Sequence, residues 1–159
     1  MTLFSDVVLR KEGDWKGQYE RFGEEAGIAD LCHIFAMLSE DERRHIDALR
    51  ALQTGGRVDF TRSTILDGAR QILRRLSAEE KALHGFRGDL HSYIAAMDFE
   101  AATARACGAL AREATHGWER ELFQMIAEED EIHFTLLEQM RELLETVARA
   151  RGGEIRDAN

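Results

Sequence analysis

The sequence predicts an all-α protein, a four-helix bundle made of two repeated helical hairpins and a long crossover between them. Three observations lead to this fold. The 159 residues contain no proline and are rich in Ala, Leu, Glu and Arg, which all favour helices. Apolar residues recur at steps of three and four along four long segments, as on the buried face of a helix. Finally, two segments of the chain are similar to each other.

The four long helices are expected at about residues 5–26, 30–53, 89–114 and 118–149. Ser5 can cap the first helix, because its side chain can accept a hydrogen bond from a free backbone N–H. Gly27 ends that helix, and Thr54-Gly55-Gly56 ends the second. Because only short turns separate the first two helices and the last two, each pair is expected to form an antiparallel hairpin.

The two hairpins are joined by a crossover over residues 57–90. It is expected to contain a short amphipathic helix at about 61–76, followed by Ser77–Glu80, which has the residues of a capping box. One long connection of this kind is typical of a four-helix bundle. The bundle is expected to form one domain over residues 1–150, with a flexible tail over 151–159.

The internal repeat places acids and histidines at matching positions. Residues 35–45 are similar to residues 123–133, an offset of 88 (123 minus 35). The same offset relates three pairs of chemically similar residues: Glu12 and Glu100, Glu42 and Asp130, and His45 and His133. The two hairpins are therefore expected to be copies of one unit.

The acids of each hairpin return to the same height in the bundle. Glu12 lies about 15 residues before the turn at Gly27 and Glu42 about 15 residues after it, so both lie roughly 22 Å from the turn at 1.5 Å per residue. Glu100 and Asp130 flank the second turn in the same way. Four acidic side chains, one from each helix, are therefore expected to meet.

These acids fall where core residues belong. The second helix has the stripe Phe35, Leu38, Glu42, His45 and Leu49. The stripe of the fourth helix has the same spacing, with Phe123, Ile126, Asp130, His133 and Leu137. In both helices a carboxylate and an imidazole interrupt an apolar stripe, so they are expected to point into the bundle.

Four buried carboxylates need compensation, since each would otherwise cost several kcal/mol or take up a proton. Two divalent cations would balance four negative charges, and one histidine beside each ion leaves room for water or an oxygen species. Mixed oxygen and nitrogen ligands suit iron, manganese or zinc better than copper(I). The candidate metal ligands are Glu12, Glu42, His45, Glu100, Asp130 and His133.

Across both hairpins, these motifs resemble the rubrerythrin family of the ferritin-like superfamily. The resemblance lies in Glu12 with Tyr19 seven residues later, Leu38–His45, Phe99–Glu100 and Ile126–Phe134. It implies a ferritin-like fold and a pair of iron ions held by the six candidate ligands, with zinc or manganese as other metals that could bind. It also implies reduction of peroxide or dioxygen, a role in oxidative stress, and a homodimer.

Three departures from the family pattern change what the resemblance implies. Asp130 stands where the family has glutamate and is shorter by one methylene, so it either binds one ion instead of two or is replaced by Glu129. Thr103 stands where rubrerythrins have a further glutamate. No Cys-x-x-Cys pair of a rubredoxin-like domain occurs, so the expected electron donor is an external protein such as a rubredoxin-like one.

Three functions remain open from the sequence. The first is an oxidoreductase that reduces peroxide or dioxygen at the two iron ions. The second is iron oxidation and sequestration as in ferritins. The third is a structural metal-binding bundle, in which an ion such as zinc contributes folding free energy without redox turnover.

Several other residues of suitable chemistry are expected to lie outside the site. Two further acid-x-x-His pairs occur near helix ends, Asp30 with His33 and Glu113 with His116. Asp30 is expected to cap the second helix. The remaining histidines, His84 and His91, fall in or near the crossover and are expected to be exposed.

Three residues near the site have open or minor roles. Tyr19 is expected in the core around the site, where its hydroxyl could also support a ligand carboxylate. The two cysteines, Cys32 and Cys107, are expected to be buried free thiols. Cys107 is expected to be a small core residue; because it shares a helix face with Glu100, a place close to the metals is the alternative.

The composition excludes some partners. A net charge of −9 argues against binding to nucleic acid, since phosphates would be repelled. There is no apolar run near the length of about 18 residues that a membrane helix needs. The first residues lack a basic region followed by an apolar one, so the protein is expected in the cytoplasm.

Overall fold

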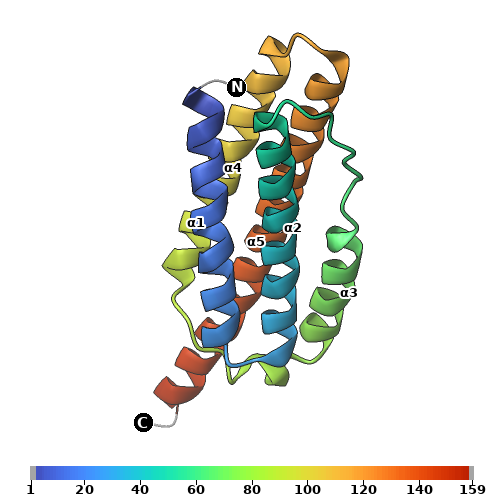
Figure 1. Ribbon diagram of the computed structural model, residues 1–159. Coiled ribbons are helices and arrows are strands. Elements are labelled where there is room, and N and C mark those ends of the chain that lie inside the picture. The colour runs from blue at the N-terminus through green and yellow to red at the C-terminus, as the bar shows by residue number, and fades with distance from the viewer. Residues whose placement is uncertain (1–2, 158–159) are drawn as a thin grey trace.

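The computed structural model describes the backbone of residues 3–157 and the side chains of residues 6–150 other than 80 and 82. This part of the chain is helical, as the sequence predicts (Figure 1). The long helices are α1 (Leu3–Glu25), α2 (Ala29–Gln53), α4 (Leu90–Glu113) and α5 (Gly117–Asp157); between them lie α3 (Ile65–Ala78) and the 3₁₀ turn η1 (Glu80–Leu83).

The four long helices lie side by side as two hairpins. The most extensive packing is between α4 and α5 and between α1 and α2, each joined by a short turn. In Figure 1, α1 and α5 run in one direction and α2 and α4 in the other. The crossover runs along the outside of the bundle, where α3 packs against α2 and α5.

Local start signals in the sequence do not set the helix boundaries. Ser5 and Ser77, which were expected to cap helices, both lie inside helices, so there is no capping box at Ser77. Asp30 lies in the first turn of α2 and pairs with Arg75 at 2.9 Å instead of capping the helix. Capping contributes only about 1 kcal/mol, so packing along the whole helix overrides it.

Two helices also differ from the expected ranges, one at its start and the other at its end. The crossover helix begins at Ile65 and not near residue 61. Helix α5 continues to Asp157, although the helix was expected to end near residue 149 and a flexible tail was expected over 151–159. Gly152 and Gly153 lower helix propensity by about 1 kcal/mol each relative to alanine, which weakens a helix without blocking it as proline would.

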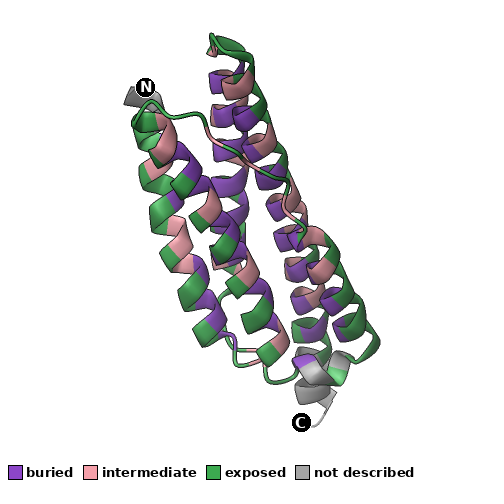
Figure 2. Cartoon of the chain, turned by 45° about the vertical axis from the view of Figure 1, so that its right-hand side comes forward, coloured by how far each residue is buried: buried purple, intermediate pink, exposed green. Residues whose placement is uncertain are grey.

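Two apolar clusters fill the bundle, one on each side of a buried polar layer. The larger cluster is rich in aromatic contacts, such as the stacked rings of Phe22 and Tyr93, and includes Leu38. The smaller cluster includes Val8 and Leu49. Figure 2 shows that the buried residues of the long helices face one another along the bundle axis. The hydrophobic contacts that stabilise the bundle therefore lie above and below the polar layer along the bundle axis.

No helix within residues 3–157 combines the length and the apolar character needed to cross a lipid bilayer.

Two glycines of the first hairpin are expected to respond in opposite ways to alanine. Gly17 is exposed inside α1 and an added Cβ would meet nothing within 4 Å, so Gly17→Ala should raise the free energy of unfolding by about 1 kcal/mol. Gly27 has φ +73°, and its Cβ would lie 3.1 Å from the Gly85 carbonyl oxygen. Gly27→Ala should therefore lower the free energy of unfolding by roughly 1–2 kcal/mol or more. Urea denaturation measures both, and a loss at Gly17 would contradict the helix placement.

Candidate metal centre

The structure brings all six candidate ligands into one buried layer. Each long helix contributes a carboxylate, and α2 and α5 each add a histidine one turn later. All six side chains have no solvent exposure: Glu12, Glu42, His45, Glu100, Asp130 and His133. The layer lies between the two apolar clusters, since Glu42 follows Leu38 of the larger cluster and precedes Leu49 of the smaller one.

The six residues form two overlapping groups that could each hold a metal ion. In each group, one ligand atom per residue lies within 4.8 Å of the others. One group contains Glu12 and His45, the other contains Glu100 and His133, and both contain Glu42 and Asp130. Two neighbouring positions that share two carboxylates are thus built into the bundle. The shorter Asp130 belongs to both groups, and Glu129 belongs to neither.

In both histidines, the ring nitrogen Nδ1 faces the candidate ligand carboxylates. His45 Nδ1 lies 3.5 Å from Asp130 Oδ1 and 3.7 Å from Glu12 Oε1. His133 Nδ1 lies 3.2 Å from Glu100 Oε1. The two imidazole rings are nearly parallel, with centroids 5.9 Å apart. Nδ1 is therefore the nitrogen available to a metal ion in each ring.

The outer nitrogen of each histidine is held by a carboxylate from the opposite hairpin. His45 Nε2 lies 2.7 Å from Glu129 Oε2, and His133 Nε2 lies 2.8 Å from Asp41 Oδ2. An ionised carboxylate only accepts hydrogen bonds, so it favours the proton on Nε2 and leaves the Nδ1 lone pair for a metal ion. Glu129, considered from the sequence as a substitute ligand, thus supports a histidine instead.

Asp41 was not identified from the sequence, although a signal for it exists. Adding the repeat offset of 88 to position 41 gives Glu129, so both supporting acids immediately precede a candidate ligand. The acid-acid-x-x-His pattern occurs as Asp41-Glu42 before His45 and as Glu129-Asp130 before His133. Acids are common in this chain, so the pattern alone could not show which of them face the histidines.

Tyr19 supports one of the candidate ligands. Its buried hydroxyl donates a hydrogen bond of 2.6 Å to Glu100 Oε1, the second of the two roles left open from the sequence. Thr103 is buried one turn after Glu100, but its hydroxyl bonds the backbone carbonyl oxygens of Phe99 and Glu100 and adds no charge to the layer. Cys107 is buried in the smaller apolar cluster.

The layer lacks hydrogen-bond partners for most of its oxygens. Unpartnered buried atoms include both carboxylate oxygens of Glu12, Glu42 and Asp130, one oxygen of Glu100, and His45 Nδ1. Buried charges without partners cost several kcal/mol each. Two divalent cations would offset the four carboxylate charges and give these atoms a partner. The donor set therefore fits a pair of metal ions.

In the absence of metal ions, several groups of the layer bind protons more tightly than they would in water. Burial, reinforced by the charge of Glu42, raises the pKa of Glu100 to about 7. Burial and the Glu100 charge also raise the pKa of Asp130. For His45, burial would lower the pKa, but the hydrogen bond to Glu129 and the charge of Asp130 raise it to about 9. Metal ions and protons thus compete for the same groups.

The other candidate histidines and acids lie outside the layer. His33, Glu113, His116, His84 and His91 are all exposed, in agreement with the sequence analysis. The expectation of two buried thiols is wrong for Cys32, which is exposed. Its neighbours Leu31, Ile34 and Phe35 take the buried face of α2, so position 32 lies on the outer face.

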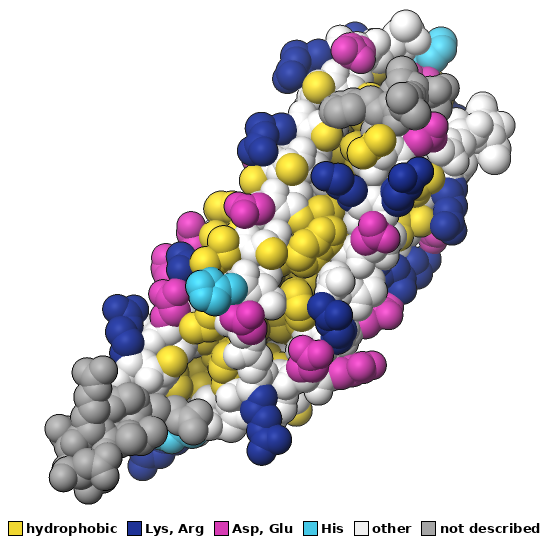
Figure 3. Space-filling view, turned by 90° about the vertical axis from the view of Figure 1, so that its left-hand side faces the viewer, with side chains coloured by type: hydrophobic (Ala, Val, Ile, Leu, Met, Phe, Trp, Pro, Cys, Tyr) yellow, Lys and Arg dark blue, Asp and Glu magenta, His cyan; other side chains and the backbone are white. Residues whose placement is uncertain are grey.

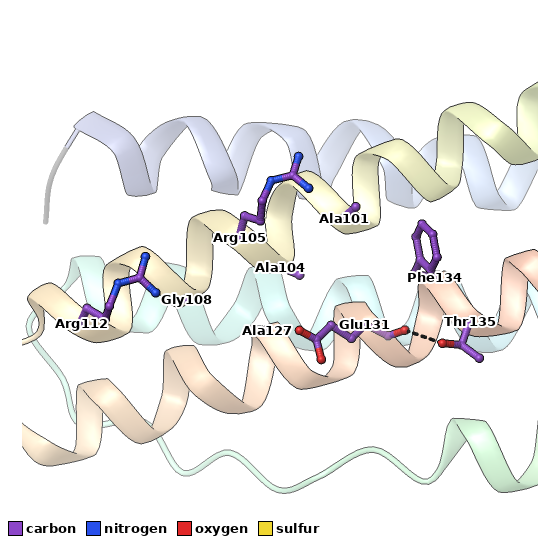
Figure 4. A pocket seen from close by; sticks show the side chains of 9 residues that line it. All are labelled: Ala101, Ala104, Arg105, Gly108, Arg112, Ala127, Glu131, Phe134 and Thr135. Carbon is purple, nitrogen blue, oxygen red and sulfur yellow. Dashed lines mark hydrogen bonds between the residues drawn. The ribbon is translucent and has the colours of Figure 1, made fainter.

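An open groove of about 610 Å³ runs along the outside of α4 and α5 but does not include the candidate ligands. Figure 4 shows small residues such as Ala104 and Gly108 along its floor. Arg105 and Arg112 also line it, and both are exposed. The candidate ligands therefore lie inside the bundle and not in this surface groove.

Comparison with family models, with curated proteins and with solved structures gives no match to this chain.

Replacing Tyr19 by phenylalanine is expected to destabilise the metal-free protein mainly at high pH. A hydrogen bond to a charged group contributes about 1.5–3 kcal/mol, and the Tyr19 bond favours ionised Glu100, whose pKa is about 7. The loss should therefore be larger near pH 8 than near pH 5 in urea denaturation. Tyr93→Phe, two turns away from Glu100 on α4, is the control. An equal loss at both pH values would show that Tyr19 acts only by packing.

Proposed function

We propose that this chain is a ferritin-like di-iron protein of the rubrerythrin type, an oxidoreductase that reduces peroxide or dioxygen with electrons from an external donor. The proposal depends above all on the two overlapping groups of buried ligands, each with one histidine and with Glu42 and Asp130 in common. No ordinary bundle core needs four carboxylates at one level, because burying them costs several kcal/mol each.

Equivalent contacts in the two hairpins support the ferritin-like part of the proposal. Each hairpin supplies one supporting acid to the histidine of the other, Asp41 to His133 and Glu129 to His45. Asp41 and Glu129 are related by the same offset of 88 as the two histidines. A pair of similar hairpins facing each other across a metal layer is the arrangement of di-iron carboxylate bundles.

The donor atoms restrict which metal ions could bind. Carboxylate oxygens and imidazole nitrogens suit iron, manganese and zinc. Iron ions bound there would supply the electrons that reduce peroxide or dioxygen, and a donor such as a rubredoxin-like protein would replace those electrons. Zinc or manganese in the same positions would leave the fold intact, so metal identity is part of the test.

The residues of the chain have separate roles in this proposal. Glu42 and Asp130 would contribute ligand atoms to both metal positions. The remaining ligands would be Glu12 and His45 at one position and Glu100 and His133 at the other. Tyr19 fixes the orientation of Glu100. The apolar clusters on both sides exclude bulk water from the layer, which strengthens the attraction between the carboxylates and cations.

A homodimer is part of the proposal. Val7 on α1 and Ile94 on α4 are the exposed large hydrophobic residues among the described side chains. Figure 3 shows apolar side chains in a strip between charged ones on the side of the molecule that α1 faces. Size-exclusion chromatography with light scattering measures the mass; a monomer would remove the dimer from the proposal and leave the metal centre unaffected.

The function is tested by loading the protein with ferrous iron without oxygen, counting bound iron, and following absorbance after rapid mixing with peroxide or with air. We expect two irons per chain and oxidation faster than that of free ferrous ion in the same buffer. Faster reaction with peroxide supports a peroxidase, and faster reaction with air supports an oxidase or ferroxidase.

Two other results would replace the proposal with one of its alternatives. Retention of many irons per chain by a large shell would indicate ferritin-like sequestration. A bound pair of ions that reacts with neither oxidant would indicate a structural metal-binding bundle.

A further inference from the structure

One segment of the crossover contacts both acids that support the histidines. Ser63 Oγ lies 2.7 and 2.8 Å from the two carboxylate oxygens of Asp41, to which it can donate its proton. The backbone N–H of Ser63 donates a hydrogen bond of 2.6 Å to Glu129 Oε1. A single residue that lies outside the four long helices is thus bonded to the supporting acids of both hairpins.

Arg44 joins the same two acids from α2. Its Nη1 lies 2.9 Å from Asp41 Oδ1 and 3.2 Å from Glu129 Oε1. Its other terminal nitrogen donates to the backbone carbonyl oxygen of Thr61. The guanidinium also lies over the ring of Phe60, 4.7 Å from its centroid. Arg44 therefore attaches the crossover to both carboxylates and neutralises part of their charge.

Phe60 extends this contact to one histidine directly. Its ring centroid lies 5.9 Å from that of His45. Phe60 thus lies beside His45, and Ser63 bonds the two acids that hold the outer nitrogens of the histidines, whereas Nδ1 of each ring faces the candidate ligands. The side chains of Asp41 and Glu129 are flexible by themselves, and each must keep one orientation to bond a ring nitrogen. Contacts with Ser63 and Arg44 restrict both side chains to that orientation.

We propose that residues 60–63 together with Arg44 form a clamp that positions both histidines at once, so that Ser63 and Arg44 are positioning residues for both metal positions. This inference rests on the proposed metal centre. Because the Arg44 side chain bonds both supporting acids, a change at Arg44 reaches both histidines. Loss of the Ser63 hydroxyl reaches chiefly His133 through Asp41, since the bond to Glu129 comes from the Ser63 backbone. A change at Asp41 or Glu129 reaches chiefly the histidine that each acid bonds.

A purely structural role for Ser63 makes a different prediction. Ser63 Oγ also accepts a hydrogen bond of 3.1 Å from the Ile65 N–H at the start of α3. If this were its whole role, Ser63→Ala would loosen α3 and leave the two histidine bonds unchanged. Thr64 provides the matched control, because it directly precedes α3 and its side chain makes no capping bond.

The experiment follows the two ring Nε2–H protons by NMR in protein with ¹⁵N-labelled histidine, both metal-free and loaded with zinc. Asp41→Asn and Glu129→Gln assign the two signals. We expect Arg44→Met, which removes the bonds to both acids, to shift both signals and to speed the solvent exchange of both protons. Zinc affinity at both positions should then fall about tenfold, the lower end of the range for lost outer contacts of metal ligands. Ser63→Ala keeps the backbone N–H bond to Glu129, so it should change chiefly the signal of His133, and Ser63→Thr, which keeps the hydroxyl, should restore that signal.

The outcomes separate the clamp from the proposed function. If Arg44→Met leaves either signal unmoved, or if Ser63→Ala leaves the His133 signal unmoved, the clamp is overturned even when zinc binds normally. If the unmodified protein binds no zinc, the metal centre fails, and the ring protons of the metal-free protein still decide whether the clamp holds both histidines. A Thr64→Ala variant that moves the His133 signal as Ser63→Ala does would also overturn the assignment to Ser63.

Discussion

Replacing Glu42 by glutamine is expected to abolish binding of both metal ions. Glu42 belongs to both groups of ligands, and neither of its buried oxygens has a hydrogen-bond partner in the protein. The amide keeps the shape of the side chain but removes a negative charge from a layer that has to balance two cations. Bound metal should fall from two ions per chain to fewer than one, measured by elemental analysis after anaerobic loading and desalting.

Glu12→Gln is the variant to compare with Glu42→Gln. Glu12 belongs to one group only, so this change should leave the position of Glu100 and His133 able to bind one ion. Glu131→Gln is the control, since Glu131 is exposed and adjacent to Asp130. Metal-free Glu42→Gln should remain folded, because it removes one of four buried carboxylates that repel one another. Two ions bound by Glu42→Gln with unchanged affinity would refute the shared-carboxylate arrangement.

The metal-free protein is expected to lose stability as the pH rises from about 5 to about 9. Folded Glu100, with its pKa raised from 4.5 to about 7, keeps a proton that the unfolded chain releases between these values, so stability falls over that window. His45 contributes stability below its ordinary pKa of 6.5 and loses it as the pH rises through about 9. At about 1.4 kcal/mol per pH unit, each group changes stability by roughly 3 kcal/mol.

At low pH, the stability of the metal-free protein depends on two other carboxyl groups. Burial would raise the pKa of Asp41 and of Glu129, but their hydrogen bonds to His133 and His45 lower both. A lowered carboxyl pKa contributes stability above the ordinary value near 4 and loses it as the pH falls through the lowered one. The metal-free protein should therefore be most stable near pH 5, between the two windows.

Metal ions should reverse the trend on the alkaline side. Binding displaces protons from Glu100, Asp130 and the histidines, so affinity and the resulting stabilisation increase with pH. Thermal unfolding with zinc and with a chelator, compared between about pH 5.5 and about pH 8, measures the difference. The increase in melting temperature on adding zinc should be several times larger at the higher pH. An increase of the same size at both would show that zinc binds elsewhere.

The sequence by itself determined the helical fold and the composition of the buried layer of carboxylates and histidines. Lack of proline and the steps of three and four fixed where long helices run, because burial of an apolar stripe outweighs local preferences. Those steps and the repeat also singled out Glu12, Glu42, His45, Glu100 and their equivalents in the second hairpin. Helix spacing is a local rule, so side chains on one face can be deduced without knowing what they touch.

The tertiary structure alone decided which acids support the histidines and what holds those acids. Asp41 and Glu129 act across the boundary between the hairpins, and Ser63 reaches both from the crossover. It also placed Cys32 on the outer face of α2. These contacts join residues far apart in the chain, and a loop has no repeating period from which its partners could be deduced. Their orientation depends on how the helices pack, which is a property of the assembled bundle.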